Sequence, residues 1–176
     1  MVVVNRLLPI THYPLPFMQA IYKDFLIRDW QTSDRDLAAA VIGAVLAEYG
    51  LGWEPVGADR DVLEIENYYL ATSGEFWVVE FQSQIVGTAG YYPFRRGEKA
   101  VEIRKMYLLP PARRLGLGKF LLQELEKAIA AKGFQQIWIE TASVLVEAIQ
   151  LYESSGYQPA TGVETARCDR IYVKNL

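Results

Sequence analysis

Apolar residues recur along the chain with two different periods. Between residues 117 and 133 they return every three or four positions, beginning at Leu117, and Gly133 then supplies a helix stop. Shorter apolar runs are typical of strands. These runs cover residues 25–30, 76–81, 85–92, 101–109 and 135–141, with a further strand expected in the tail at 168–175. The pattern therefore predicts one mixed sheet with helices packed around it.

Three more stretches complete the predicted organisation. Residues 36–48 form an apolar-rich helix with Thr32, Ser33 and Asp34 as N-cap candidates, and further helices are expected at 61–71 and 144–154. Glycine and proline make residues 50–60 a loop. We expect residues 1–23 to be an extended lead-in and residues 24–176 to form a single domain.

The strand at 101–109 changes phase in its middle. Val101 and Ile103 share one phase and Met106 and Leu108 share the other. Because side chains alternate strictly along a regular strand, a change of phase requires an extra residue. This predicts a β-bulge near residues 104 and 105. The alternative is a strand buried on both faces, in which apolar residues need not alternate with polar ones.

The order of elements around this strand defines a crossover. The runs at 76–81 and 85–92, separated by a short polar turn, predict an antiparallel hairpin. The run at 101–109 is followed by a glycine-rich loop, a helix and the strand at 135–141, which predicts a right-handed βαβ unit with two parallel strands. The expected fold class is α/β, with a sheet that contains both antiparallel and parallel pairs.

The loop of the βαβ unit, residues 110–118, is the strongest candidate for a binding site. Gly116 and Gly118 remove two side chains where the N–H groups at a helix start have no acceptor. Such donors, with the positive end of the helix dipole, favour a phosphate, and Arg113, Arg114 and Lys119 add charge. Two glycines before a helix are also typical of an ordinary tight turn.

Composition narrows the possible chemistry. The 176 residues, 51% of them hydrophobic, suit one domain with a large core. A single cysteine, Cys168, and a single histidine, His12, argue against an internal disulfide, a zinc site and a serine hydrolase triad, so we expect no metal. No apolar run is long enough to span a membrane, and prolines interrupt the opening segment, so we expect a cytoplasmic protein that does not bind membranes.

Charge is distributed unevenly along the chain. The net charge of −3 gives no reason to expect nucleic-acid binding. Residues 95–119 nevertheless carry eight basic and two acidic side chains. A basic strip on an acidic protein indicates a small anionic ligand, although Arg95, Arg96 and Lys99 fit equally well on a solvated hairpin edge.

Two motifs resemble one enzyme family. Residues 113–118 read Arg-Arg-Leu-Gly-Leu-Gly and are similar to the Gln/Arg-x-x-Gly-x-Gly/Ala loop of the GCN5-related N-acetyltransferases (GNAT). Residues 148–157 resemble the later Ala-x-x-x-Tyr-x-x-x-Gly-Phe segment of the same family, one helix, one strand and a second helix further along. The resemblance implies a mostly antiparallel sheet with a parallel, splayed strand pair and helices on both faces.

The resemblance also implies a cofactor, acetyl-CoA, and its contacts. Backbone N–H groups of Met106 and Leu108 would hold the pantetheine arm, for which the predicted bulge would open a strand edge. Residues 114–119 would enclose the pyrophosphate. The complete set of expected cofactor contacts is Met106, Tyr107, Leu108, Arg113, Arg114, Leu115, Gly116, Leu117, Gly118 and Lys119.

Acetyl transfer to an amine requires an acid for the departing thiolate and a way to keep the amine neutral. By the resemblance, Tyr152 is the acid; an isolated tyrosine would more often simply pack in the core. Glu102 and Glu140 are alternative bases, a water chain could replace both, and a salt bridge to Arg104 would spoil Glu102. The family often has Asn where this chain has Leu145, so that contact is lost or comes from Thr141 or Ser143.

The acceptor and two competing functions remain open. We expect a primary amine, whether on a small molecule, a peptide N-terminus or a lysine, near Trp53 and Glu54, the tyrosine pairs 68–69 and 91–92, and residues 160–167. A non-catalytic CoA-binding or regulatory module is the alternative function, and a homodimer is left open. A dinucleotide-binding oxidoreductase fits poorly, because Lys119 and Leu122 break its glycine pattern.

Overall fold

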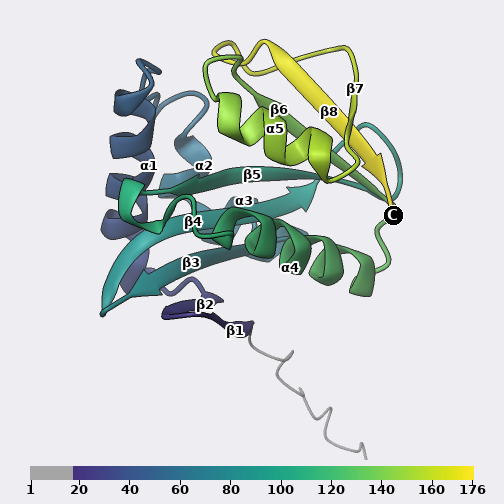
Figure 1. The fold of residues 1–176 in the computed structure, drawn as a ribbon. Helices are drawn as coiled ribbons and strands as arrows, with labels where there is room; N and C mark the ends of the chain where they lie inside the picture. The colour runs from purple at the N-terminus through teal and green to yellow at the C-terminus, as the bar shows by residue number, and fades with distance from the viewer. Residues whose placement is uncertain (1–17) are drawn as a thin grey trace, which may run out of the picture.

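A computed structural model describes residues 18–176; His12 and the rest of 1–17 lie outside the described residues. Within residues 18–176, eight strands form one sheet in the order β1-β2-β3-β4-β5-β6-β8-β7 (Figure 1). The pairs are antiparallel except for β5 with β6, which run parallel. The strands are β1 Gln19–Tyr22, β2 Phe25–Asp29, β3 Glu75–Phe81, β4 Gln84–Pro93, β5 Ala100–Leu108, β6 Gln136–Thr141, β7 Gln158–Pro159 and β8 Arg170–Asn175. The predicted mixed sheet is confirmed.

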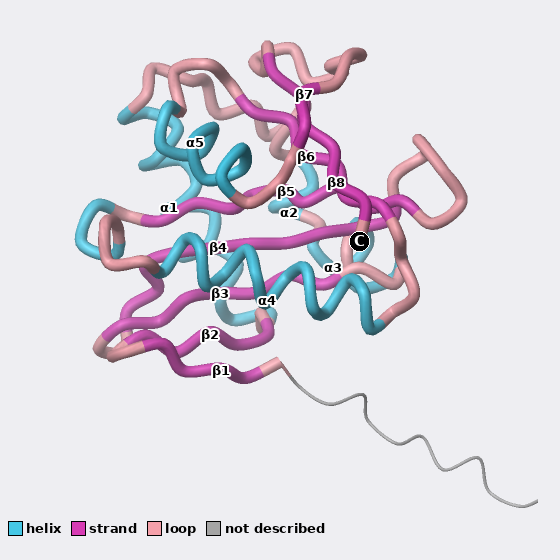
Figure 2. The backbone as a smooth tube through the Cα atoms, turned by 45° about the vertical axis from the view of Figure 1, so that its right-hand side comes forward, coloured by secondary structure: helices cyan, strands magenta, loops and turns pink. Residues whose placement is uncertain are grey.

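Helices cover both faces of the sheet, as the views in Figures 1 and 2 show. On one face lie α1, Arg35–Glu48, and two short helices, α2, Arg60–Leu63, and α3, Ile65–Tyr68. On the other lie α4, Leu117–Ala131, and α5, Val146–Ser154. Each face has its own core cluster, one around Leu121 and the other around Ile42.

β3 shows why the sheet is buried on both sides. Trp77 and Val79 belong to the core cluster under α4, whereas Phe76 and Val78 belong to the cluster under α1. All four are at most 1% exposed. A strand covered on both faces gains from apolar residues at successive positions, which explains its unbroken apolar run. The hairpin to β4 turns through Gln82 and Ser83, both with positive φ, as a two-residue turn requires.

The predicted bulge in β5 is confirmed. Thr88 of β4 pairs with Tyr107, yet Gly90 pairs with Arg104, so one residue of β4 faces two residues of β5. The extra residue is Lys105, whose φ is 54°. The alternative of burial on both faces also holds, but only before the bulge, where Glu102 and Ile103 are each 2% exposed.

β5 and β6 separate soon after they meet. Their parallel pairing covers only Ala100–Glu102 against Gln136–Trp138. From residue 103 onward the edge of β5 has no strand beside it on this side, within the described part of the chain. A bulge bends its strand and increases the local twist, which is a physical reason for the separation. The splayed parallel pair is therefore present.

Two parts of the fold differ from the sequence expectation. The prediction of a single helix at 61–71 is wrong. Glu64, with φ −126° and ψ 46°, divides this stretch into α2 and α3. The break lets Asp61 face Arg104 while Tyr69 enters the core. The other difference lies in the stretch expected as lead-in, where β1 forms an edge strand paired with β2. No helix in the described part of the chain is long and apolar enough to cross a membrane.

The N-cap candidates act differently from the expectation. Residues Thr32–Asp34 form a short 3₁₀ turn, and Asp34 stands at the N-cap of α1 without a side-chain cap bond. Its carboxylate instead accepts hydrogen bonds from Arg28 and from the N–H of Gln31. The bond from Gln31 is the capping-box contact of the 3₁₀ turn, so Asp34 caps that turn rather than α1, and Arg28 of β2 adds an ion pair.

The bulge predicts the effect of one substitution. The Thr88 hydroxyl is buried and donates to the Lys105 carbonyl oxygen at 2.7 Å. We expect Thr88→Val to lower the free energy of unfolding by about 1–3 kcal/mol, because the buried carbonyl loses its donor. Urea unfolding measures this. Thr72→Val is the control, since the bond of that exposed hydroxyl to the Tyr68 carbonyl is open to water; equal losses in the two variants would contradict the account.

Candidate active site

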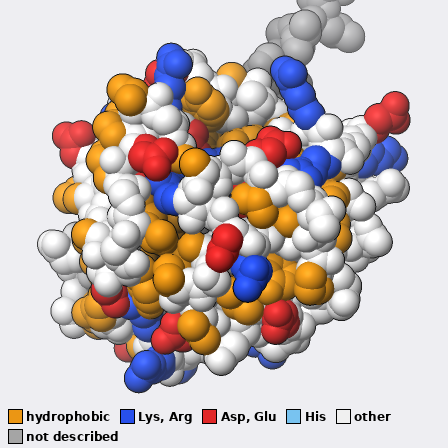
Figure 3. Space-filling model, turned by 90° about the horizontal axis from the view of Figure 1, so that it is seen from above, with side chains coloured by type: hydrophobic (Ala, Val, Ile, Leu, Met, Phe, Trp, Pro, Cys, Tyr) orange, Lys and Arg blue, Asp and Glu red, His pale blue; other side chains and the backbone are white. Residues whose placement is uncertain are grey.

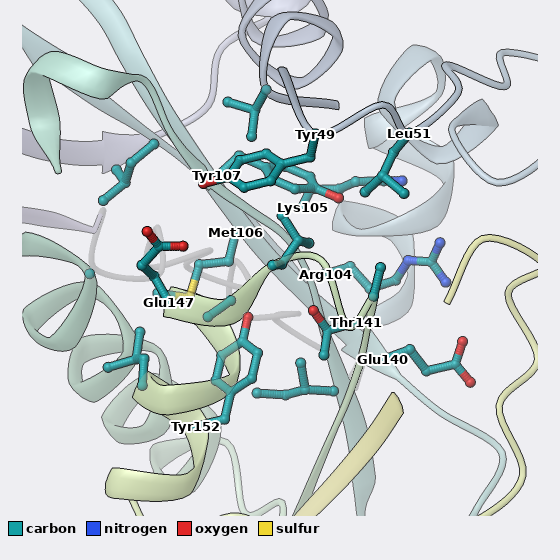
Figure 4. Close-up of a pocket in the computed structure, with 18 of the residues that line it drawn as sticks. Tyr49, Leu51, Arg104, Lys105, Met106, Tyr107, Glu140, Thr141, Glu147 and Tyr152 are labelled. Atoms are coloured by element: carbon teal, nitrogen blue, oxygen red, sulfur yellow. The ribbon is translucent and has the colours of Figure 1, made fainter. Parts of the chain in front are cut away.

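A cleft of about 630 Å³ opens where β5 and β6 separate. One wall is β5 from Ile103 to Leu108, and the other comes from the end of β6 and from α5 (Figure 4). Glu48 and Tyr49 at the end of α1 close one side. Of the expected cofactor contacts, six line the cleft: Met106, Tyr107, Leu108, Arg113, Arg114 and Gly118.

The edge of β5 presents backbone donors to this cleft. The N–H of Leu109, which follows the strand, donates to the Val86 carbonyl oxygen of β4 at 2.8 Å. Because N–H groups alternate in direction along a strand, those of Leu108 and Met106 point the other way, into the cleft. This free edge is a template for an extended ligand that carries amides. Tyr107 also lines the cleft, and burial raises the pKa of its phenol to about 12.

The loop before α4 holds a run of unused donors. The N–H of Arg113 bonds to Pro110, and the next amide with an acceptor is that of Phe120, which bonds to Gly116. The six N–H groups of residues 114–119 have no acceptor among residues 18–176. They lie at the start of a 15-residue helix, where the helix dipole adds positive potential. The backbone alone therefore makes an anion site.

Gly116 shapes this loop. Its φ is +85°, and an added Cβ would lie 2.5 Å from the Tyr22 hydroxyl oxygen. That hydroxyl and the Lys23 ammonium both donate to the Leu115 carbonyl oxygen. Fixing the carbonyl toward β1 leaves the neighbouring N–H groups to face the other way. The edge strand that the sequence analysis did not recognise thus supports the loop.

The side chains of the loop contribute less than expected. Arg113 makes two hydrogen bonds to the Glu48 carboxylate, at 2.7 and 2.8 Å, so its charge is already neutralised. Arg114 is exposed and lies 3.9 Å from the Glu147 carboxylate, Leu115 and Lys119 are exposed outside the cleft, and Leu117 is buried in the core. At these last three positions only the backbone can reach a ligand in the cleft.

Tyr152 is set into the cleft from α5. It is 5% exposed, and its side chain projects toward Met106 (Figure 4). Its hydroxyl has no hydrogen-bond partner among the described residues. Burial, with the nearby Tyr107 and Cys168, raises the phenol pKa, so Tyr152 stays protonated at neutral pH. The group can donate a proton to an atom placed in the cleft.

Glu102 lies beside the cleft, outside its lining residues. The salt bridge that the sequence warned of is present, with 3.2 Å between Arg104 Nη1 and Glu102 Oε2. Burial nonetheless raises the Glu102 pKa to about 7, against the opposing charge of Arg104. The second oxygen, Oε1, accepts no hydrogen bond from residues 18–176.

Glu140 lines the cleft but is occupied by the backbone. Its two oxygens accept hydrogen bonds from the N–H groups of Glu164 and Thr165, at 2.7 and 2.8 Å. Figure 4 shows its carboxylate pointing away from Tyr152. This glutamate therefore holds the loop between β7 and β8, and the structure does not bring it together with Tyr152.

A buried ionic cluster that the sequence analysis missed forms part of the wall. Asp59 and Asp61 face Arg104, Lys105 and Arg167, and every one of these side chains is at most 17% exposed. Four of the eight basic residues at 95–119 are thus held in ion pairs within the chain: Arg96, Arg104, Lys105 and Arg113. Figure 3 shows both charge signs interspersed on the face seen from above. The only sequence signal was a pair of nearby aspartates, Asp59 in the glycine-rich loop and Asp61 at the start of the expected helix.

The position where the family often has Asn is occupied by a leucine that lines the cleft, Leu145. Thr141 lines the cleft too, whereas Ser143 does not and spends its N–H on Asp169. Thr141 is therefore the better placed of the two expected substitutes.

One cleft thus contains the edge of a splayed strand, a loop of N–H groups without acceptors among the described residues and a phenol that stays protonated at neutral pH. The chain belongs to the GNAT family of acetyltransferases, whose family model matches residues 18–157. It is an N-acetyltransferase of that family.

Individual relatives agree with this assignment. An uncharacterized N-acetyltransferase of Escherichia coli K12, YjgM, is 36% identical over 137 residues, which are 76% of this chain and 81% of the relative. The Xenopus laevis protein camello is 31% identical over 135 residues, 72% of this chain but only 62% of camello. The chain thus spans less than two thirds of camello.

Solved structures share the fold. A GNAT acetyltransferase of Staphylococcus aureus Mu50 superposes with a TM-score of 0.80 at 21% identity, covering 86% of this chain and 98% of that one. The protein yncA of Salmonella typhimurium, solved with its cofactor acetyl-CoA, superposes with a TM-score of 0.70 at 19% identity, covering 87% and 94%.

The loop geometry generates a prediction. Gly116→Ala forces a Cβ onto a backbone with φ +85° and against Tyr22, which should displace the amides and weaken acetyl-CoA binding about tenfold in isothermal titration. Gly133→Ala is the control, because Gly133 has φ +83° with open space around it. Equal affinities for the two variants would contradict the assigned role of the loop.

Proposed function

We propose that this protein transfers the acetyl group of acetyl-CoA directly to a primary amine. The single observation that carries the proposal is continuity: one cleft runs from the loop of free amides, past the open edge of β5, to the Tyr152 hydroxyl. A cofactor with a diphosphate, an extended amide arm and a thioester requires those three features in that order.

The residues of the cleft fit acetyl-CoA part by part. The N–H groups of residues 114–119 would bind the pyrophosphate, and the exposed Arg114, which among the described residues has only a 3.9 Å ion pair with Glu147, would add charge from outside. Met106 and Leu108 would hydrogen-bond the pantetheine amides through their backbone. The structure of yncA with acetyl-CoA supports the same use of this fold.

Tyr152 takes the role of general acid. Its raised pKa keeps the phenol protonated, and its free hydroxyl has nothing else to bond among the described residues. It would donate its proton to the sulfur as the bond to the acetyl carbon breaks, since a thiol leaves more readily than a thiolate.

For the base we favour Glu102 over Glu140. Glu140 is committed to two backbone N–H groups, whereas Glu102 keeps Oε1 free and has a pKa of about 7. A carboxylate with that pKa accepts protons efficiently near neutral pH. Because Glu102 lies behind the cleft lining, we propose that it takes the amine proton through water.

The acceptor would enter through a second pocket of about 380 Å³. Arg104 lines both this pocket and the cofactor cleft, so the two lie next to each other. Glu54, Tyr68, Tyr92 and Glu164 line its walls, as the sequence analysis expected for an amine. Small molecules, peptide N-termini and lysine side chains all remain candidates.

The proposed activity can be tested directly. Acetyl-CoA binding is measured by isothermal titration, and thiol release is followed with a panel of primary amines. We expect binding together with turnover on at least one amine class. Binding without turnover on any amine would favour the non-catalytic module.

Tyr152→Phe tests the acid. We expect kcat to fall by more than about tenfold while acetyl-CoA affinity stays unchanged, because only the proton donor is lost. Tyr157→Phe is a matched control: this neighbouring tyrosine is 1% exposed, and its hydroxyl is also without a partner in the described structure. If the two variants lose activity equally, Tyr152 is not the acid.

Glu102→Gln tests the base through pH. In the wild type, kcat/KM should rise with pH through about 7 as Glu102 loses its proton and becomes the base. The profile is recorded with a lysine-type amine, which titrates about three pH units higher, so the two limbs separate. In the glutamine variant the limb near 7 should vanish, and kcat/KM at pH 8 should fall about a hundredfold. A limb that persists near pH 7 would exclude Glu102.

A further inference from the structure

Asp59 is the most completely buried charged group beside the cleft. Its side chain is 0% exposed and accepts four hydrogen bonds. The donors are the N–H of Glu54, the Lys105 ammonium and both terminal nitrogens of Arg167, at 2.6–2.8 Å. Burial alone would raise the pKa of Asp59, but Arg167 and Lys105 outweigh burial and lower it to about 2. The carboxylate is therefore ionised at every practical pH.

The two cations that Asp59 holds belong to opposite sides of the splay. Lys105 is the extra residue of β5, the strand that forms one wall. Arg167 lies in the segment that leads into β8, the strand paired with β6 in the other wall. Both line the cofactor cleft. One carboxylate thus bridges the two halves where no backbone pairing joins them.

Lys105 needs this anion for a specific reason. It is a non-glycine residue with φ 54°, a conformation that is costly for a side chain with a Cβ. Its ammonium lies 2.6 Å from Asp59 Oδ1, 2.8 Å from the Ala58 carbonyl oxygen and 3.2 Å from Asp61 Oδ1. These contacts offset the free-energy cost of the strained Lys105 backbone that forms the bulge.

Arg167 is tied just as firmly. Its guanidinium makes a two-armed contact with Asp59 and donates to the Gly52 carbonyl oxygen at 3.1 Å. Without the carboxylate, Lys105 and Arg167 would be two buried cations facing each other, a repulsive arrangement in a medium that screens charge weakly.

We propose that Asp59 is a positioning residue that maintains the width of the cofactor cleft, because it holds Lys105 in the bulge of β5 and holds Arg167 against that bulge. The inference rests on the proposed function of the cleft in binding acetyl-CoA, and it names the residue that determines the width of that cleft. Asp59 lines neither the cleft nor the second pocket, and it acts through the two cations.

Asp59→Asn is the direct test, because it removes the charge and keeps the size. We expect Kd and KM for acetyl-CoA to rise about tenfold, with kcat at saturating cofactor changing less than about threefold. A residue that took part in the chemistry would instead lower kcat.

Asp34→Asn controls for lost stability. Asp34 is also a buried aspartate, 6% exposed and bonded by an arginine, but it stands at the opposite end of α1 from Glu48 and Tyr49 of the cleft. It should lower Tm while leaving Kd within about twofold. If Asp59→Asn changes Kd no more than Asp34→Asn does at a similar Tm, the inference is wrong.

A double variant separates positioning from general damage. Combining Asp59→Asn with Lys105→Met removes the stranded cation, so the double variant should bind acetyl-CoA no more weakly than Asp59→Asn alone. If the Kd of the double variant instead rises by the product of the two single-variant increases, the inference is wrong. If Asp59→Asn does not fold, Arg167→Met is tested in its place, because it removes the Arg167 contact with Asp59 and leaves the Lys105 contact. This variant should still raise Kd for acetyl-CoA at least about threefold, and an unchanged Kd would overturn the inference. A wild type that fails to bind acetyl-CoA would refute the proposed function itself, and this inference with it.

Discussion

One extra residue in β5 determines the geometry of the site. Lys105 adopts φ 54° and shifts the pairing with β4, and β5 stays beside β6 only through Glu102. The bulge explains the free strand edge, since a bent and twisted β5 cannot follow β6 any further. It also places Arg104 and Lys105 on the same side, where Asp59 and Asp61 receive them. Cleft and ionic cluster are two consequences of one backbone feature.

Binding and chemistry are divided between backbone and side chains. Most of the charges that look available in the sequence are committed to folding: Arg113 to Glu48, Arg96 to the loop at 161–164, and Glu140 to two amides. What remains for a ligand is largely N–H groups, together with the hydroxyl of Tyr152. A site built from backbone amides binds phosphate without a high density of positive side chains. This agrees with an enzyme whose net charge is −3.

The sequence predicted those parts of the fold that depend on local order. The phase change between Ile103 and Met106 located the bulge, and the glycines at 116 and 118 located the loop. The partners of charged side chains could not be found this way, because Asp59 and Arg167 lie 108 positions apart and meet only in the folded chain. For the same reason the sequence left Glu102 and Glu140 as alternative bases, because the bonds of Glu140 to the amides of residues 164 and 165 form only in the folded chain. The edge strand β1 escaped notice because its four residues carry little pattern of their own.

The central claim is that the amides of the glycine loop and of β5 bind the cofactor. Two-dimensional ¹⁵N–¹H spectra of the labelled protein, recorded while CoA is added, test it residue by residue. Our expectation is that the largest shifts fall on the amides of residues 114–119, Met106 and Leu108. Unmoved signals there, with shifts gathered instead around Arg95 and Arg96, would contradict it.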